Sequence, residues 1–134
     1  MLIPTLHFPG TCDEAIAYYK EIAGAEVKTI MHFRDAPPDT GIDLPPNFVM
    51  YSEVLLFGTL LSMTDGAEKQ VNCDIFTLTL ALDSIDDVTA LFHKLAEDGQ
   101  AVEYLAPQFW TSLSGYVTDR FGVNWNIFTR DALE

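Results

Sequence analysis

Hydrophobic and polar positions alternate with a period of two in several short segments of this chain. In the segment from Val123 to Phe128, the apolar Val123, Trp125 and Ile127 fall on one face, while two asparagines fall on the other. Strict alternation of this kind predicts a half-buried strand. The turn before it, Asp119 to Gly122, predicts a tight hairpin. The same pattern predicts strands near residues 2–8, 26–33, 49–56, 60–64, 74–82, 101–105, 113–118 and 123–128.

Two other segments carry hydrophobic residues at helical spacing. The first, near residues 12–23, starts with Thr11-Cys-Asp-Glu14, which predicts a capping box. Gly24 then predicts a left-handed C-cap. The second, near residues 85–98, follows the favourable N-cap Ser84, and we expect Gly99 to end it.

The order of elements is the same in both halves of the chain: strand, helix and three strands. The predicted N-caps Thr11 and Ser84 are 73 residues apart, and the glycines Gly24 and Gly99 are 75 apart. Two near-equal offsets indicate a duplication, although a chance likeness of two α+β halves is the alternative. We therefore predict an α+β fold in which modules at residues 1–66 and 73–130 form a single domain, 1–134.

Composition narrows the classes of partner. The formal net charge is −13, with seven basic residues and no basic stripe, so nucleic acid and anionic membranes are poor partners. No apolar run approaches the roughly 20 residues of a membrane helix, and the N-terminus lacks the basic region of a signal peptide. Two cysteines are too few for a disulfide framework, which favours a cytoplasmic, reduced protein.

Two further features lie outside the strand pattern. The segment from Arg34 to Asn47 contains four prolines and a glycine, and its length predicts a lid or a dimer arm. Cys12 falls in the first turn of a predicted helix, where the helix dipole lowers the pKa of a thiol. We favour a quiet structural cysteine over a reactive one.

Several segments resemble a known family over nearly the whole chain. They are Leu2-Ile-Pro-Thr-Leu-His-Phe, Asp13-Glu-Ala-Ile-Ala-Tyr-Tyr-Lys, and Phe109-Trp followed by Val117-Thr-Asp-Arg-Phe-Gly-Val-Asn-Trp. They resemble the vicinal oxygen chelate superfamily of glyoxalase I, extradiol dioxygenases and bleomycin-resistance proteins. Within it they resemble the PhnB-like, 3-demethylubiquinone 3-methyltransferase-like branch.

The resemblance implies two βαβββ modules whose mixed sheets curl into an open cup with the helices outside. It also implies a homodimer. The methyltransferase label gains no support from the residues. A methyl donor normally lies on a doubly wound sheet with a glycine-rich loop after the first strand, and Pro9-Gly10 is no such loop.

The superfamily's metal site takes a histidine or glutamine and a glutamate from each module. Carried across residue by residue, these positions fall on Ile3, Ser62, Thr77 and Asn126. A divalent cation needs carboxylate or imidazole ligands, and this set offers neither. We therefore expect no metal and no cofactor.

Other polar and aromatic residues are candidates for binding a ligand. His7 shares a face with Ile3 and could be a general acid or base, with Glu53 and Tyr51 as possible partners; the alternative is a histidine satisfied by a neighbour. Trp110 could wall a pocket or pack in the core. Four further residues could bond a ligand or form the hydrated face of a sheet: Thr77, Thr79, Asn124 and Asn126.

These features leave three hypotheses for function. The first, which we favour, is a protein that binds a small organic molecule in its cup without metal. The second is a lyase, isomerase or dioxygenase relative that uses a relocated metal or a metal-free pair, His7 and Glu53. The third is a protein-interaction module whose own side chains fill the cup. Fold alone does not choose among them.

Overall fold

The computed structural model describes residues 1–39 and 41–133. The element order is β1 (Thr5–Phe8), α1 (Cys12–Ala23), β2 (Glu26–His32), η1 (Phe33–Asp35), β3 (Val49–Leu56), β4 (Thr59–Asp65), β5 (Leu78–Leu82), α2 (Ile85–Ala96), β6 (Gln100–Gln108), β7 (Thr111–Thr118), β8 (Asn124–Thr129) and η2 (Arg130–Leu133). The predicted order of strands and helices is confirmed.

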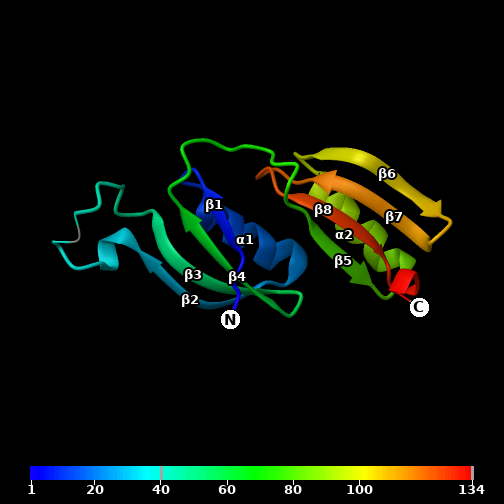
Figure 1. Cartoon of the computed structure of the whole chain (residues 1–134), viewed down its shortest axis with the longest axis horizontal. Helices are drawn as coiled ribbons and strands as arrows, with labels where there is room; N and C mark the ends of the chain where they lie inside the picture. Colours follow the sequence, from blue (N-terminus) through cyan, green and yellow to red (C-terminus); the bar gives the residue numbers. More distant parts are fainter. Residues whose placement is uncertain (40, 134) are drawn as a thin grey trace. The chain divides into compact units, whose positions relative to one another are not determined.

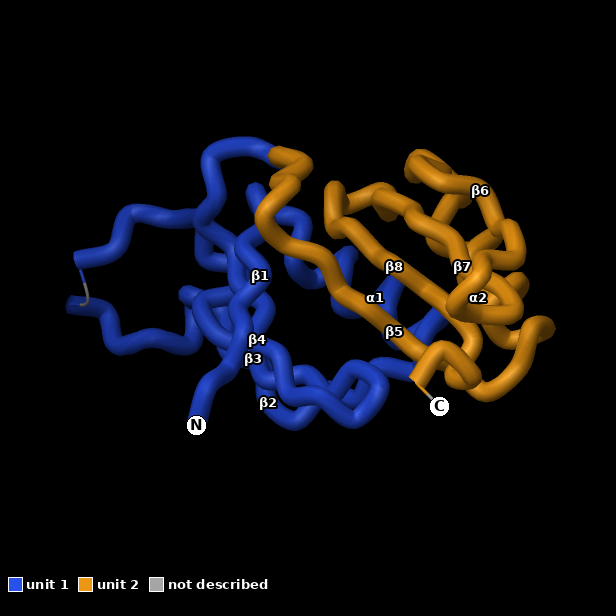
Figure 2. Tube along the Cα trace, turned by 45° about the vertical axis from the view of Figure 1, so that its right-hand side comes forward, with its two compact units in different colours: residues 1–70 blue, residues 71–134 orange. Residues whose placement is uncertain are grey.

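The chain forms two compact units, Met1–Gln70 and Val71–Glu134, each with one four-stranded sheet and one α-helix (Figures 1 and 2). The strand order is β1-β4-β3-β2 in the first unit and β5-β8-β7-β6 in the second. In each sheet the first strand pairs in parallel with the last, and the other pairings are antiparallel. The two halves therefore share one topology, as the sequence predicted. Their predicted membership of one domain stays a prediction.

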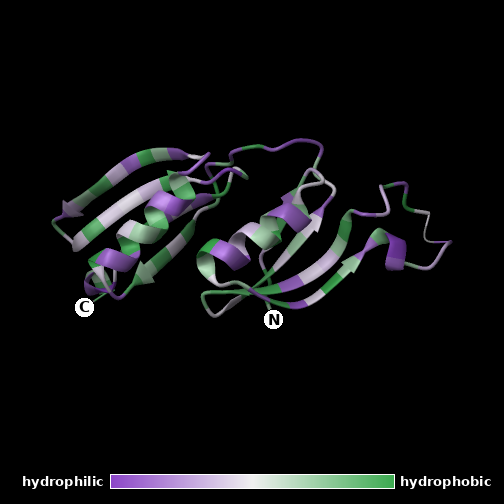
Figure 3. Cartoon of the chain, turned by 180° about the vertical axis from the view of Figure 1, so that it is seen from behind, coloured by the Kyte–Doolittle hydropathy of each residue, from purple (hydrophilic) through white to green (hydrophobic). Residues whose placement is uncertain are grey.

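One face of each sheet packs against the helix of its own unit. Helix α1 buries Ile16 and Tyr19 against β3 and β4, and α2 buries Val88 and Phe92 against β7 and β8. Hydrophobic and hydrophilic residues alternate along both helices, as their amphipathic pattern requires (Figure 3). Trp125 on β8 is 1% exposed, so the apolar face predicted for residues 123–128 is the buried one.

The hairpin between β7 and β8 forms as predicted, around a buried carboxylate. Asp119 Oδ1 accepts the backbone amides of Phe121 and Val123, and its Oδ2 accepts the indole N–H of Trp125 at 3.0 Å. Gly122 has a φ of 84°, which the turn requires and a glycine adopts without strain.

Strand limits differ from the predictions by three or more residues at three places. Strand β1 begins at Thr5, because Pro4 lacks an amide hydrogen and enters the sheet only through its carbonyl, which accepts Ser62 N–H at 2.9 Å. Strand β5 begins at Leu78, since the Asn124 side chain holds the preceding segment instead of a strand ladder. Strand β6 runs on to Gln108, beyond the predicted end at Leu105.

The predicted capping box of α1 is wrong. The Thr11 side chain makes no capping bond, and its buried hydroxyl has no hydrogen-bond partner among the described residues. The amide of Cys12 instead donates to Asp65 Oδ1 at 3.0 Å, and the amide of Val49 donates to Asp65 Oδ2 at 2.8 Å. A carboxylate from the end of β4 therefore caps the helix. The other end follows prediction, since Gly24 is left-handed with a φ of 65°.

The role predicted for Gly99 also differs. Helix α2 ends at Ala96 with Glu97 as its C-cap, and Asp98 rather than Gly99 takes the positive φ, 59°. A Cβ built on Gly99 would lie 2.4 Å from the carbonyl oxygen of Thr118. Glycine is needed there because β7 passes so close, and not because the helix needs a left-handed cap. The predicted N-cap of α2 is confirmed, since Ser84 accepts the amide of Asp87.

Candidate functional site

The face of each sheet that turns away from its helix, the helix-free face, carries the predicted site residues. In the first unit, Thr5 pairs with Ser62 and His7 with Thr64 across β1 and β4. Their neighbours Leu6 and Phe8 point to the helix side and are buried. On β3 the same face carries Tyr51 and Glu53, whose cross-strand partners on β2 are Met31 and Thr29.

His7 is exposed, and its Nδ1 lies 3.0 Å from the hydroxyl oxygen of Thr64. Thr64 is itself 9% exposed, so its hydroxyl sits at the floor of this face. The interaction fixes one ring nitrogen of His7, and the other remains available to a ligand. The sequence analysis missed Thr64, although its place two residues after Ser62 in an alternating strand puts both on one face.

Glu53 pairs with Tyr51 and not with His7. The phenol of Tyr51 donates to Glu53 Oε1 at 2.6 Å, and this bond, followed by burial and the Glu53 charge, raises the pKa of Tyr51. Within the described residues, no hydrogen bond joins His7 to either of them. The structure thus brings together Tyr51 and Glu53, and separately His7 and Thr64. It does not form the His7–Glu53 pair that a metal-free acid–base mechanism would use.

In the second unit, neutral groups dominate the helix-free face. Asn126 lies between Thr79 on β5 and Tyr116 on β7, its cross-strand partners. The Thr77 hydroxyl, just before β5, shares a hydrogen bond with the Tyr116 phenol. Tyr116 was not anticipated, although its alternation with Ser114 and Thr118 in the sequence indicates this face. The group supplies hydroxyl and amide donors and acceptors without a formal charge.

Asn124 supports the surrounding structure. Its amide nitrogen donates to the carbonyls of Cys73 and Phe76, at 2.9 and 3.2 Å, and its oxygen accepts the Thr118 hydroxyl at 2.8 Å. Both N–H groups are therefore engaged, and the side chain is 6% exposed. Its role is to fix the segment that leads into β5, beside Thr77.

Trp110 stands in the turn between β6 and β7 and is 40% exposed. Its ring meets that of Phe128 edge-to-face, with centroids 5.3 Å apart. Because Phe128 shares the helix-free face with Asn126, Trp110 forms an aromatic border of that face. Plain core packing, the alternative, would have buried it.

The superfamily's metal positions hold no charged or imidazole ligand. Ile3 lies before β1, and Ser62, 4% exposed, offers only a hydroxyl. Thr77 and Asn126 add a second hydroxyl and a neutral amide. Among the described residues, no three His, Cys, Asp or Glu side chains are grouped so as to hold a metal ion. This donor set does not fit a divalent cation, which requires anionic or imidazole ligands to replace its water.

The region after β1 does not fit a dinucleotide or methyl-donor loop either. A Cβ on Gly10 would lie 2.6 Å from the Phe48 ring, so that ring fills the space beside Gly10. At the N-terminus of α1 the amide of Cys12 donates to the carboxylate of Asp65, whose negative charge opposes a ligand anion there. The described residues after β1 therefore do not form the loop that would bind a methyl donor.

Cys12 is fully buried in the first turn of α1. Burial, and after it the charges of Asp65 and Asp13, raise the pKa of its thiol far above the usual range. Desolvation and the two carboxylates together outweigh the helix dipole. The expectation of a quiet structural cysteine agrees with this environment.

Comparison with known proteins identifies relatives along the whole chain. The sequence model of a family described as 3-demethylubiquinone-9 3-methyltransferase matches residues 1–128. Protein YjdN of Escherichia coli K12 is 30% identical over 136 residues, which cover 94% of this chain and 92% of YjdN. The crystal structure of PA1353 from Pseudomonas aeruginosa is 27% identical, covers 96% of both chains and has a TM-score of 0.82.

A more distant structure shares the fold. It is a variant of the fosfomycin resistance protein FosX from Listeria monocytogenes, complexed with Mn(II) and 1S,2S-dihydroxypropylphosphonic acid. It is 13% identical, covers 96% of this chain and 90% of its own, and has a TM-score of 0.67. These matches confirm the predicted glyoxalase/bleomycin-resistance fold. In the described residues, no helix is long and apolar enough to cross a membrane.

Proposed function

We propose a binding function from the premise that this chain belongs to the 3-demethylubiquinone-9 3-methyltransferase family, the PhnB-like branch of the vicinal oxygen chelate superfamily. The chain binds a small organic molecule on the helix-free faces of its sheets, without the superfamily's divalent metal. The proposal rests on the residues at the positions that the family resemblance assigns to the metal ligands, which are Ile3, Ser62, Thr77 and Asn126.

The remaining chemistry supports a neutral or weakly polar ligand. Hydroxyl and amide groups can orient such a molecule, and an aromatic border can cover its apolar part. The net charge of −13 disfavours a strongly anionic ligand. The residues proposed to contact a ligand are His7 and Tyr51 in the first unit, and Thr77, Thr79, Trp110 and Asn126 in the second, where Asn124 holds the neighbouring segment.

The FosX relative shows what the second hypothesis would require. That protein binds Mn(II) in the same fold, so an enzymatic function here would need a metal at other residues or the pair His7 and Glu53. Neither is favoured, because these two side chains bond to Thr64 and Tyr51 instead. A protein-interaction function is the third alternative, and the absence of any co-purifying compound would favour it.

The test has two arms on protein isolated from its own host. Native mass spectrometry is expected to show a co-purifying organic compound. Titration with Zn²⁺, Ni²⁺, Mn²⁺ and Fe²⁺, followed by calorimetry and elemental analysis, is expected to show no stoichiometric binding. Stoichiometric metal that is lost in Asn126→Ala or His7→Ala would contradict the proposal.

A matched pair of variants locates the ligand. Loss of one hydrogen bond lowers affinity by about 1 kcal/mol, or roughly fivefold, so Asn126→Ala should weaken retention of the compound to that degree. Gln100→Ala removes a side-chain amide from an exposed position at the start of β6 and should leave retention unchanged. Equal retention by both variants would place the ligand elsewhere.

The family resemblance and the sheet edges also support a homodimer. Strands β2 and β6 are edge strands, and they expose Met31, at 41%, and Val102, at 53%. Open edges with exposed apolar residues are a liability unless something covers them. A second copy would do so. The expected cytoplasmic location and the absence of nucleic-acid and membrane partners stay predictions.

A further inference from the structure

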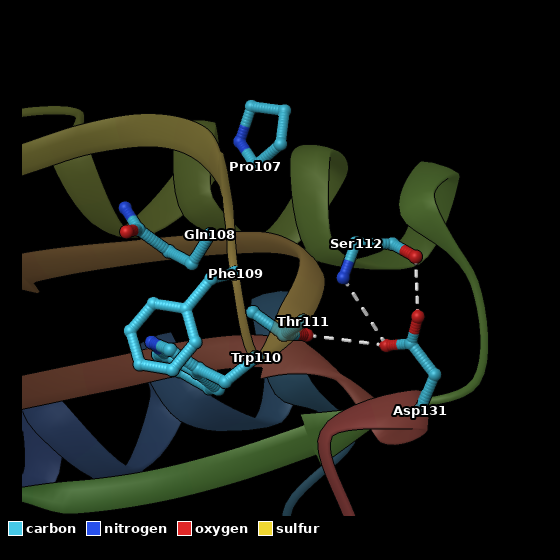
Figure 4. Close-up of a pocket in the computed structure, with 7 residues that line it drawn as sticks. All are labelled: Pro107, Gln108, Phe109, Trp110, Thr111, Ser112 and Asp131. Carbon is cyan, nitrogen blue, oxygen red and sulfur yellow. Dashed lines mark hydrogen bonds between the residues drawn. The ribbon is translucent and has the colours of Figure 1, made fainter.

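The second unit has a recess at one end. Of the residues proposed to contact the organic ligand, Trp110 alone also lines this recess. The recess has a volume of about 360 Å³ and is lined by the β6–β7 turn and the start of η2 (Figure 4). This volume is in the range of sites for small ligands. The lining residues, which define the hairpin recess, are Pro107, Gln108, Phe109, Trp110, Thr111, Ser112 and Asp131.

The turn of this hairpin consists of two aromatic residues. Strand β6 ends at Gln108 and β7 begins at Thr111, so Phe109 and Trp110 alone connect them. Two-residue turns usually contain glycine, asparagine or aspartate, which tolerate a positive φ. Neither aromatic residue has a positive φ, and Phe109 is fully exposed. Turn geometry and core packing therefore do not account for Phe109.

The other wall of the recess is an ionised carboxylate. Asp131 Oδ1 accepts Thr111 Oγ1 at 3.1 Å, Ser112 N at 3.3 Å and Thr129 Oγ1 at 2.5 Å, and Oδ2 accepts Ser112 Oγ. The pKa of Asp131 is lowered to about 2, and the hydrogen bonds from the side chains of Ser112 and Thr129 are the main causes. The group is therefore charged throughout the physiological range.

This charge has no cationic partner in the described part of the chain. The adjacent Arg130 turns to Asp83, with Nε 2.7 Å from Oδ1. A carboxylate oxygen can accept about two hydrogen bonds, and Oδ2 of Asp131 receives one. One acceptor position on the carboxylate thus stays available, on the wall of the recess opposite the Phe109 and Trp110 rings, with Thr111 between them (Figure 4).

We propose that the hairpin recess binds an organic cation, an alkylammonium group whose apolar substituents lie against Phe109 and Trp110 while its charge faces Asp131. Ring faces attract ammonium groups through their quadrupole, and a neighbouring carboxylate adds a charge interaction. The negative field of the whole chain adds to both. A metal ion is a poor alternative, because only one carboxylate is present and no His, Cys or Glu lines the recess.

The first test uses the unaltered protein and two probes of nearly equal shape. Choline and its uncharged carbon isostere, 3,3-dimethylbutan-1-ol, are titrated while the amide signals of Thr111, Ser112 and Asp131 are followed by NMR. An exposed cation–π contact and an exposed ion pair together should make choline bind about threefold or more tightly. Its affinity should fall with added salt.

Matched variants assign the preference to the recess. Asp131→Asn should reduce the preference for choline, because only the cation–π contact then distinguishes the two probes. Phe109→Ala should weaken both probes by removing an apolar contact, and because Phe109 is fully exposed its loss leaves no cavity. Glu97→Gln removes one exposed charge from the end of α2 in the same unit and should change nothing. Thermal unfolding checks that each variant is folded.

Three results would overturn the proposal. Equal binding of choline and the neutral isostere would show that the recess does not distinguish a cation from a neutral molecule. Shifts confined to residues outside the hairpin recess would place the cation elsewhere. A preference that is undiminished in folded Asp131→Asn would assign Asp131 a purely structural role. The organic ligand of the proposed function enters none of these measurements, so the two proposals fail separately.

Discussion

Two buried carboxylates act alike at the scale of single residues. Asp65 and Asp119 are 7% and 3% exposed, and each accepts backbone amides that no strand or helix satisfies. An unpaired buried amide costs about 1–3 kcal/mol, so each carboxylate stabilises the fold by meeting several donors at once. Asp119 serves its own turn. Asp65 joins the start of α1 to the start of β3.

Replacing Asp65 should therefore be costly. Asp65→Ala leaves the amides of Cys12 and Val49 without an acceptor, and we expect the free energy of unfolding to fall by about 3 kcal/mol. Urea denaturation followed by circular dichroism measures the change. Asp74→Ala, at an exposed position, is the control and should stay within about 0.5 kcal/mol of the original protein. A similar small effect for Asp65→Ala would show that water replaces the carboxylate.

At the scale of elements, the sequence predicted the position of each helix. It predicted the hydrogen bonds that cap the helix ends only in part. Ser84 and Gly24 act locally, so the residues beside them reveal their roles. The cap of α1 comes from Asp65, which is 53 residues from Cys12 in sequence. A partner so distant leaves no local signal, and the Thr11 capping box was the wrong inference for that reason.

Gly99 provides a test at the same scale. Gly99→Ala would push a Cβ to 2.4 Å from the Thr118 carbonyl oxygen, which belongs to a paired strand and cannot move freely. Overpacking of this kind costs about 1–3 kcal/mol, and we expect the upper end of that range in chemical denaturation.

Gly24→Ala is the comparison for this change. Nothing lies within 4 Å of a Cβ at Gly24, so only the strain of a left-handed alanine applies, about 1 kcal/mol. If Gly99→Ala cost no more than Gly24→Ala, the close approach of β7 would not be what requires the glycine.

The candidate site was predictable to the extent that strand alternation decides it. Alternation placed His7, Tyr51, Glu53 and Asn126 on the helix-free faces, as the strand pairings now place them. Hydrogen-bond partners were not predictable, because they depend on register between strands far apart in sequence. The His7 pairing with Thr64 spans 57 residues.

At the scale of the whole molecule, the two sheets have the same strand order. Core packing specifies a fold, and the side chains on a helix-free face can differ without changing it. The positions that the family resemblance assigns to the metal ligands carry Ile3, Ser62, Thr77 and Asn126 here, so the shared topology does not by itself imply a shared metal site.

The same architecture leads to the prediction of a homodimer. Each sheet ends in a long edge strand, β2 or β6, whose exposed apolar residues and unpaired backbone groups favour pairing with another chain. Closed two-fold symmetry satisfies such edges without open-ended assembly. Light scattering at micromolar concentration should therefore give about twice the mass of a 14.9 kDa chain.

Charged substitutions can identify the edge that is used. Met31→Glu on β2 or Val102→Glu on β6 places a carboxylate at an apolar edge, and the variant at the interface should shift the mass toward one chain. Ala90→Glu, on the exposed side of α2, introduces the same charge and should leave the dimer intact. A mass of 14.9 kDa for the unaltered protein would contradict the prediction, and the exposed edges would then need another cover.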